Sequence, residues 1–103
     1  MNSGTINATG GKQAVYNEGG TVEIGGTAQF TSNASGAYND VNRATVQSNT
    51  GSLTITGGTI TNTSGAAVSI VTGTLIIGTQ DNVFDSSSPV LQGKTYGVSS
   101  ATA

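Results

Sequence analysis

Short runs in which polar and aliphatic residues alternate recur along the chain. The clearest are residues 21–24 (TVEI), 52–55 (SLTI) and 74–77 (TLII), each with aliphatic residues at its second and fourth positions. Such alternation is typical of a β-strand that buries one face. We therefore predict three equivalent strands whose inward side chains align in two columns: Val22, Leu53 and Leu75 in one, and Ile24, Ile55 and Ile77 in the other.

Two further strands accompany each of these runs. A short strand with Val at its second position precedes the run, at Val15, Val46 and Val68, and a Gly-rich or polar turn separates the two. Another strand opens each unit after a glycine, at Thr5-Ile6, Thr27-Ala28 and Thr59-Ile60. Units of three strands that repeat about every 20 residues, with one longer unit, predict the coils of a parallel β-helix.

The predicted β-helix has about four coils of three short strands, and its last coil is irregular. The extra residues of the longer unit lie within residues 36–44 (GAYNDVNRA). Pro89-Val90-Leu91 is predicted to replace the Ala-Val strand in the last coil. An antiparallel sandwich is the alternative fold. The recurrence of one strand-turn-strand unit with chemically matched columns favours the β-helix, because a sandwich does not require such columns at a fixed period.

The length and composition agree with a piece of a solenoid. The 103 residues include 16 glycines, and only 8% of the chain is charged. A β-helix coil buries its apolar face only when neighbouring coils stack on it, and the two ends of a short stack expose backbone edges. We therefore expect residues 1–103 to form a single β-solenoid segment. It is either part of a longer repeat protein or a unit that associates end to end with further copies.

The charge of the chain argues against two classes of partner. The formal net charge is −2, and only three residues are Lys or Arg, whereas nucleic-acid affinity depends largely on such residues. The sequence has neither a long apolar run nor a basic amphipathic stretch, so we expect no direct membrane insertion. The first residues, MNSGTINATG, do not have the pattern of a secretory signal peptide.

The residue types also argue against catalysis. The chain has no His and no Cys, which excludes a Ser-His triad and thiolate metal sites. Glycoside hydrolysis usually needs two carboxylates that face one sugar, and Asp81 and Asp85 are the closest pair. Their surroundings, DNVFD, are also typical of a polar turn that caps backbone groups. We therefore expect no enzymatic activity, no metal site and no cofactor.

Asparagine recurs in three similar motifs, NATG at Asn7, NASG at Asn33 and NTSG at Asn62. Each has the N-x-[ST] pattern of an N-glycosylation acceptor, but each also follows the first strand of a coil. Asn suits such turns, because it tolerates left-handed backbone and bonds to neighbouring amides. We therefore predict turn residues that stack in an Asn ladder, in which Asn7 and Asn62 are the best-aligned pair.

Exposed aromatic residues suggest a weak alternative, a carbohydrate-binding surface. Tyr16 follows the inward-facing Val15 and is therefore predicted to face outward. Tyr38 and Asp40 lie in the predicted insertion and complete the candidate glycan site. Phe30 is predicted to belong to the core.

Two segments resemble repeats of large cell-surface proteins of bacteria, of the kind found in gut Gram-positive species. They are residues 51–60 (GSLTITGGTI) and the pair 78–82 (GTQDN) and 88–97 (SPVLQGKTYG). The resemblance extends over about residues 4–97. It implies a pectate-lyase-like, right-handed parallel β-helix at the cell surface or outside the cell. That group contains stalks and adhesin-like regions as well as polysaccharide lyases and hydrolases, and none of its catalytic motifs is present here.

Together these observations predict a non-catalytic, structural or adhesin-like segment of a bacterial surface or secreted protein. The expected partner is a cell-surface glycan or a host protein. One alternative function is a glycan-binding module. Others are a non-catalytic piece of a polysaccharide lyase or hydrolase, and a solenoid that assembles end to end.

Overall fold

The computed structural model describes residues 1–35, 44–78, 88–94 and 97–100. Within these ranges the chain forms β-strands and no helix. The strands are β1 (Thr5–Asn7), β2 (Val15–Ile24), β3 (Gln29–Ser32), β4 (Ala44–Ile55), β5 (Thr59–Asn62), β6 (Ala66–Ile70), β7 (Thr74–Ile77), β8 (Val90–Gly93) and β9 (Val98–Ser100).

Four of the strands form the first sheet, which we call sheet A. Its order is β1-β3-β5-β8, and every neighbouring pair is parallel. Its side chains alternate between the core and solvent, as expected for strands with one buried face. The register aligns one inward column, which consists of Ile6, Phe30, Ile60 and Leu91.

The second sheet, sheet B, is bent. Its order is β2-β4-β6-β9, and β7 also pairs with β4. The strands β2 and β4 have 10 and 12 residues, so each is long enough to turn a corner. The first part of β4 pairs with β6 and its last part pairs with β7. We call the two parts the first arm (the starts of β2 and β4, with β6 and β9) and the second arm (the ends of β2 and β4, with β7).

Glycines in left-handed conformation make the corner between the two arms. The φ angles of Gly19, Gly51 and Gly73 are 109°, 91° and 99°. A Cβ atom on Gly51 would lie 2.2 Å from the Gly20 carbonyl oxygen, and one on Gly73 would lie 2.1 Å from that of Gly51. Because backbone lies directly above backbone here, only glycine fits at Gly51 and Gly73.

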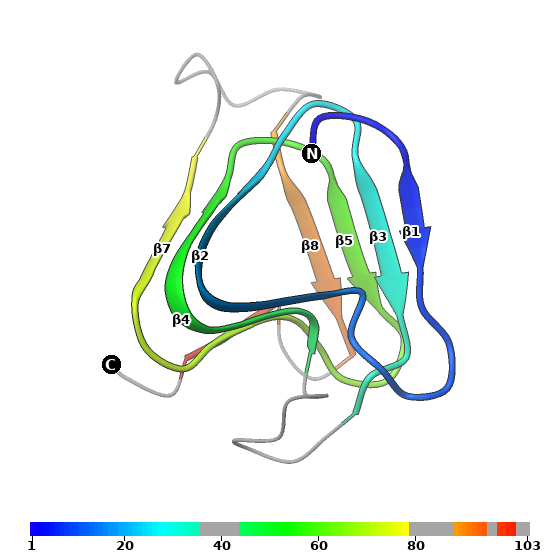
Figure 1. Ribbon diagram of the computed structural model, residues 1–103. Helices are drawn as coiled ribbons and strands as arrows, with labels where there is room; N and C mark the ends of the chain where they lie inside the picture. Colours follow the sequence, from blue (N-terminus) through cyan, green and yellow to red (C-terminus); the bar gives the residue numbers. More distant parts are fainter. Residues whose placement is uncertain (36–43, 79–87, 95–96, 101–103) are drawn as a thin grey trace.

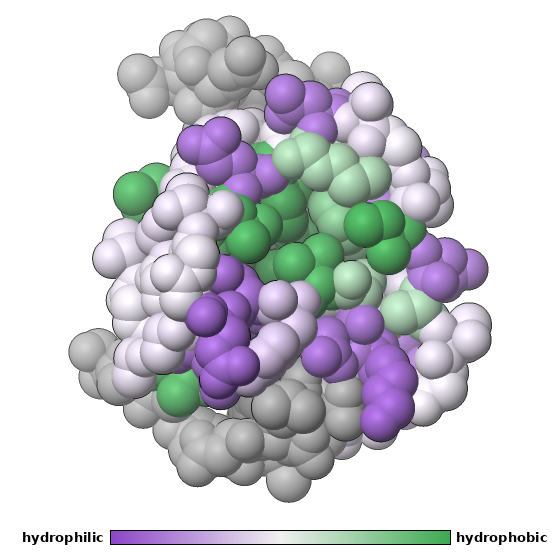
Figure 2. Space-filling model, in the orientation of Figure 1, coloured by the Kyte–Doolittle hydropathy of each residue, from purple (hydrophilic) through white to green (hydrophobic). Residues whose placement is uncertain are grey.

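The two arms and sheet A surround a common core (Figure 1). The buried cluster consists of Ile24, Ala28, Phe30, Val46, Leu53, Ile55, Ile60, Ala67 and Val68. At the end of the stack formed by β1 and β2, apolar side chains gather in the centre and polar residues surround them (Figure 2). Partly buried Ile6, Val15 and Val22 pack against the core cluster from these two strands.

Sequence alternation predicts these inward columns correctly. Val22 pairs with Leu53 and Leu53 with Leu75, while Ile24, Ile55 and Ile77 align in the same way. The Val residues of the first arm also align, from Val15 through Val46 to Val68. The all-β class and the parallel pairing are thus confirmed, and the arrangement is compatible with a β-helix.

One predicted strand is displaced by two residues. The middle strand of sheet A begins at Gln29 rather than at Thr27-Ala28, so that Phe30, and not Ala28, pairs with Ile6 and Ile60. The reason is a turn that follows the glycine pair and extends through Thr27. The Ala28 amide donates to the Gly25 carbonyl oxygen within the turn, and the Thr27 amide donates to the carbonyl oxygen of Asn2. The regular register with β1 and β5 therefore starts at Gln29.

The last coil also differs from its prediction. Val90 and Leu91 lie in sheet A, paired with Thr59 and Ile60, and do not replace the Ala-Val strand of the first arm. That position belongs to β9, in which Val98 pairs with Val68. The connection from β5 to β8 in sheet A is therefore also long. The predicted insertion, residues 36–43, lies outside the described ranges.

Candidate functional site

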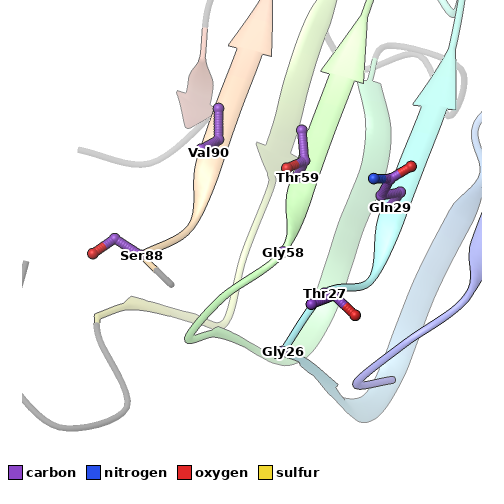
Figure 3. A pocket seen from close by; sticks show the side chains of 7 residues that line it. All are labelled: Gly26, Thr27, Gln29, Gly58, Thr59, Ser88 and Val90. Atoms are coloured by element: carbon purple, nitrogen blue, oxygen red, sulfur yellow. The ribbon is translucent and has the colours of Figure 1, made fainter. Parts of the chain in front are cut away.

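The outer face of sheet A carries a hollow of about 190 Å³ (Figure 3). It lies where β3, β5 and β8 begin, next to the turns that lead into these strands. The residues that line it are Gly26, Thr27, Gln29, Gly58, Thr59, Ser88 and Val90. The hollow is therefore assembled from three successive coils and from no contiguous sequence motif.

Strand register explains why these residues meet. Gln29, Thr59 and Val90 are register partners, so their side chains stand in one outward column on neighbouring strands. Gly26 and Gly58 line the hollow without a side chain that would fill it. Gly58 has a φ of 85°, and a Cβ atom there would lie 2.6 Å from the Ala28 carbonyl oxygen.

Among the described residues that line it, the hollow is polar and uncharged. Its side chains offer the hydroxyl groups of Thr27 and Thr59, the carboxamide of Gln29 and the apolar surface of Val90, whereas Ser88 is only 7% exposed. General acid–base catalysis needs a side chain that exchanges a proton, and none of the seven lining residues has a titratable side chain. The lining therefore suits the binding of a neutral ligand by hydrogen bonds.

Of the residues predicted to bind glycans, Tyr16 is described, and it does not line this hollow. Tyr16 lies in β2 of sheet B, where it is half-buried and pairs with the fully buried Gln47. Desolvation raises the pKa of the Tyr16 phenol, and the negative charge of Glu18 and a hydrogen bond to its side chain raise the pKa further. The phenol therefore stays protonated at a pH where a free tyrosine begins to ionise. Tyr38 and Asp40 lie outside the described residues.

Asn62 is a buried structural residue at the end of β5. Its side chain is 3% exposed, and its Nδ2 donates to the carbonyl oxygens of Ala34 and Ala66 at 2.8 Å and 2.7 Å. Its Oδ1 accepts hydrogen bonds from the amides of Ser64 and Gly65 at 2.9 Å and 2.8 Å. The side chain thus closes the turn between β5 and β6 and ties it to the coil below.

The strand register contradicts the predicted Asn ladder. Asn7 pairs with Thr31, whereas Asn62 pairs with Ser32, so the two Asn residues belong to neighbouring columns. Asn33 follows Ser32 and is exposed, and its Oδ1 accepts a hydrogen bond from the Gly11 amide at 2.9 Å. The three similar motifs therefore occupy three different environments, because they do not stand at equivalent positions of their coils.

A second buried Asn was not predicted from the sequence. Asn17 is 5% exposed, and its Nδ2 donates to the Ser48 hydroxyl and to the carbonyl oxygens of Gly20 and Ser52. Its Oδ1 accepts from the Gly20 amide. The sequence does carry a signal for it, since Asn17 lies at an inward position two residues before Gly19 of the corner.

Neither a metal cluster nor a membrane-spanning helix is found in the part of the chain that the structure describes. No three His, Cys, Asp or Glu residues among those described lie close enough together to hold a metal ion. None of the described segments forms a helix that is long and apolar enough to cross a membrane. Asp81 and Asp85 lie outside the described ranges.

Comparison with protein-family models, with curated protein sequences and with solved structures gave no match. The class of the protein is therefore defined by its own fold, an all-β arrangement of two parallel sheets around one core. On the outer face of sheet A lies a hollow whose described lining residues are uncharged.

Proposed function

We propose that the chain is a segment of a right-handed parallel β-helix that serves as a non-catalytic, adhesin-like scaffold at a bacterial cell surface or outside the cell. The observation that carries this proposal is the set of inward columns, which run through successive strands of both sheets. Each layer covers the one before it, as in a solenoid whose stability comes from contacts between neighbouring coils.

The distribution of polar groups supports a scaffold over an enzyme. The buried polar side chains of Asn17, Ser32, Thr45 and Asn62 bond to backbone groups or to other buried side chains. They hold corners and turns in place. The carboxylates among the described residues, Glu18 and Glu23, lie on the exposed surface of β2 and do not face a shared cavity.

The surface location can be tested on cells that produce the protein. Antibodies against residues 1–103 are expected to label intact cells, or to detect the protein in the medium, and brief protease treatment of intact cells should remove the label. An antibody against a cytoplasmic protein, applied to intact and permeabilised cells, serves as the control. Labelling that appears only after permeabilisation would contradict the proposal.

The hollow on sheet A favours glycan binding as a second candidate function. Its hydroxyl and carboxamide groups can exchange hydrogen bonds with sugar hydroxyls, and Val90, which is 44% exposed, can contact the apolar face of a sugar ring. Sites for drug-sized ligands have volumes of about 300–1,000 Å³. The smaller volume of this hollow suits one uncharged sugar unit of a longer glycan.

A glycan array with two matched variants tests this candidate. Thr59→Val removes a hydroxyl from the hollow, and we expect it to weaken binding to a neutral glycan about two- to tenfold, since a hydrogen bond contributes about 0.5–1.5 kcal/mol. Thr61→Val is the control, because Thr61 is on the same strand and the same face but does not line the hollow. Equal effects of both variants, or an array without any bound glycan, would contradict the assignment. A loss caused only by Tyr16→Ala would move the site to sheet B.

A further inference from the structure

The fold places the three N-x-[ST] motifs, at Asn7, Asn33 and Asn62, differently with respect to the core. Asn62 comes two residues after the inward-facing Ile60, so its side chain also points inward, where it is 3% exposed. Asn7 comes one residue after Ile6, which belongs to the same inward column as Ile60, so Asn7 points outward and is exposed. A difference of one residue therefore decides which of the two Asn side chains another molecule can reach.

The exposure of Asn7 comes from the outer face of sheet A. Its register partner is Thr31, whose own partner is Thr61, and all three side chains point away from the core. A further parallel strand beside β1 would lie in the plane of the sheet and would leave this face open. The accessibility of Asn7 therefore follows from its position in the strand and does not depend on how the stack continues.

The side chains of the Asn7 motif are accessible and unbonded. Asn7 and Thr9 are both exposed, and no described residue forms a hydrogen bond with the carboxamide of Asn7 or with the hydroxyl of Thr9. In Asn62, by contrast, Nδ2 donates to the carbonyl oxygens of Ala34 and Ala66. Since Nδ2 is the atom to which an Asn-linked sugar is attached, attachment at Asn62 would require the turn between β5 and β6 to open.

Asn33 is the intermediate case. Its side chain is exposed, but its Oδ1 accepts a hydrogen bond from the Gly11 amide at 2.9 Å. An enzyme that takes up the Asn33 carboxamide must first break this bond, which joins the turn after β3 to the segment after β1. Among the three motifs, the one at Asn7 is therefore the only one whose carboxamide is both exposed and free of hydrogen bonds to the described residues.

The segment after the Asn7 motif leaves space for an enzyme. Thr9 is followed by Gly10 and Gly11, and a Cβ atom added at either glycine would have no neighbouring atom within 4 Å. Exposed segments of small residues are the sites at which other enzymes, proteases above all, act on folded proteins. The Ala8 amide still donates to the Thr31 carbonyl oxygen at 2.9 Å, so the motif begins on the sheet and ends in this open segment.

We propose that Asn7 is an N-glycosylation site of the folded protein. Its Nδ2 forms a bond to the anomeric carbon of a sugar that is supplied as a glycosyl diphosphate, linked either to a nucleotide or to a lipid. The bond from the anomeric carbon to the diphosphate oxygen breaks, the diphosphate leaves with the electron pair, and Nδ2 gives a proton to a base of the transferase. Thr9 supplies the hydroxyl that completes the acceptor motif.

The inference rests on the place of the motif in the fold. It requires neither the scaffold role nor the glycan-binding hollow to be correct, because a sugar is attached to the chain here and is not bound by it. An attached sugar would add a bulky, soluble group to the outer face of sheet A.

Trypsin separates the three motifs, because the chain has three Lys or Arg residues, Lys12, Arg43 and Lys94, and each motif lies in a different tryptic peptide. In protein isolated from the cells that produce it, mass spectrometry is expected to find a sugar on Asn7 in the peptide that ends at Lys12. We expect no sugar on Asn62. A single sugar unit indicates a nucleotide-linked donor, and an oligosaccharide transferred as a whole indicates a lipid-linked donor.

Three variants produced in the same cells identify the acceptor atom. Asn7→Gln and Thr9→Val are each expected to abolish the modification, the first by removing the acceptor and the second by removing the hydroxyl of the motif. Thr5→Val is the matched control, because Thr5 is an exposed residue of the same strand outside the motif, and it is expected to leave the modification unchanged. Circular dichroism checks that all three variants are folded.

Two peptides separate the effect of the fold from that of the local sequence. They have the sequences of residues 4–11 (GTINATGG) and 59–66 (TITNTSGA), and each contains one motif. In an extract of the same cells we expect both free peptides to accept the sugar, since neither is folded. Modification of only the first peptide would mean that local sequence, and not burial, protects Asn62, and would contradict the argument from the fold.

Three further outcomes would overturn the proposal. The first is a peptide ending at Lys12 that carries no sugar, and the second is a sugar on Asn62 to the same extent as on Asn7. The third is a modification that persists in Asn7→Gln but is lost in Thr9→Val, because the sugar would then be linked to the Thr9 oxygen.

Discussion

Gly51→Ala is expected to lower the free energy of unfolding by more than about 3 kcal/mol, because two separate costs coincide at this corner. The first is conformational, since the φ of 91° lies in the left-handed region, where an L-residue other than glycine is disfavoured by about 1–2 kcal/mol. The second is steric. The added Cβ would lie 2.2 Å from the Gly20 carbonyl oxygen, which belongs to the backbone of the neighbouring coil and can move only with that coil.

Gly10→Ala separates these two costs. Gly10 has a similar φ of 82°, but a Cβ atom added there would have no neighbouring atom within 4 Å. Its substitution is therefore expected to cost only the conformational part, about 1–2 kcal/mol. Urea unfolding of both variants measures the difference. Equal decreases in the free energy of unfolding for the two variants would mean that the backbones of successive coils are not in contact at the corner.

Asn62→Leu is expected to lower the free energy of unfolding by about 3 kcal/mol, because leaving a buried polar group without a partner costs about 1–3 kcal/mol. Leucine has a similar volume, so packing is largely kept. The substitution leaves the amides of Ser64 and Gly65 and the carbonyl oxygens of Ala34 and Ala66 without the Asn62 side chain. In a domain of about 100 residues, this loss corresponds to a decrease in Tm of more than about 10 °C.

Asn33→Leu is the matched control for this result. Asn33 belongs to a similar motif, but it is exposed, and among the described residues its side chain has one hydrogen bond, accepted by Oδ1 from the Gly11 amide. We expect its substitution to cost less than about 1 kcal/mol. Thermal unfolding followed by circular dichroism compares the two variants. The same Tm for Asn62→Leu and for the wild type would contradict the structural role of this side chain.

Much of the fold follows from the sequence because alternation determines which face of a strand is buried. Val22, Leu53 and Leu75 occupy equivalent positions in three similar runs, and the structure aligns them in one column. Local pattern is sufficient here because each run is preceded by a glycine corner of the same length. The register between neighbouring strands therefore follows from the repeat.

The register of sheet A could not be predicted in the same way. Thr27-Ala28 and Gln29-Phe30 both follow a glycine pair and both fit the alternation, so period-2 patterning does not distinguish them. Hydrogen bonds from the Thr27 and Ala28 amides to other turn residues decide between them. One of these bonds joins residues that are distant in the sequence, and the other lies within an irregular turn. The alternation of polar and apolar residues predicts neither of them.

The candidate site was less predictable than the fold. Thr59 lines the hollow and Thr61 does not, yet both are outward-facing threonines of one strand. The difference comes from the turns of three coils, which meet only in the folded protein. The Asn motifs show the same limit, because similar sequences give a buried Asn62 and an exposed Asn33.

The order and direction of the strands are the central claim of this account, and nuclear Overhauser effects between backbone protons test them most directly. Parallel pairing predicts cross-strand contacts from Val22 to Leu53 and from Leu53 to Leu75, and from Ile6 to Phe30 and on to Ile60. An antiparallel sandwich would instead give contacts between consecutive strands, such as residues 52–55 with Thr59–Asn62. Contacts of the second kind, without the first, would contradict the account.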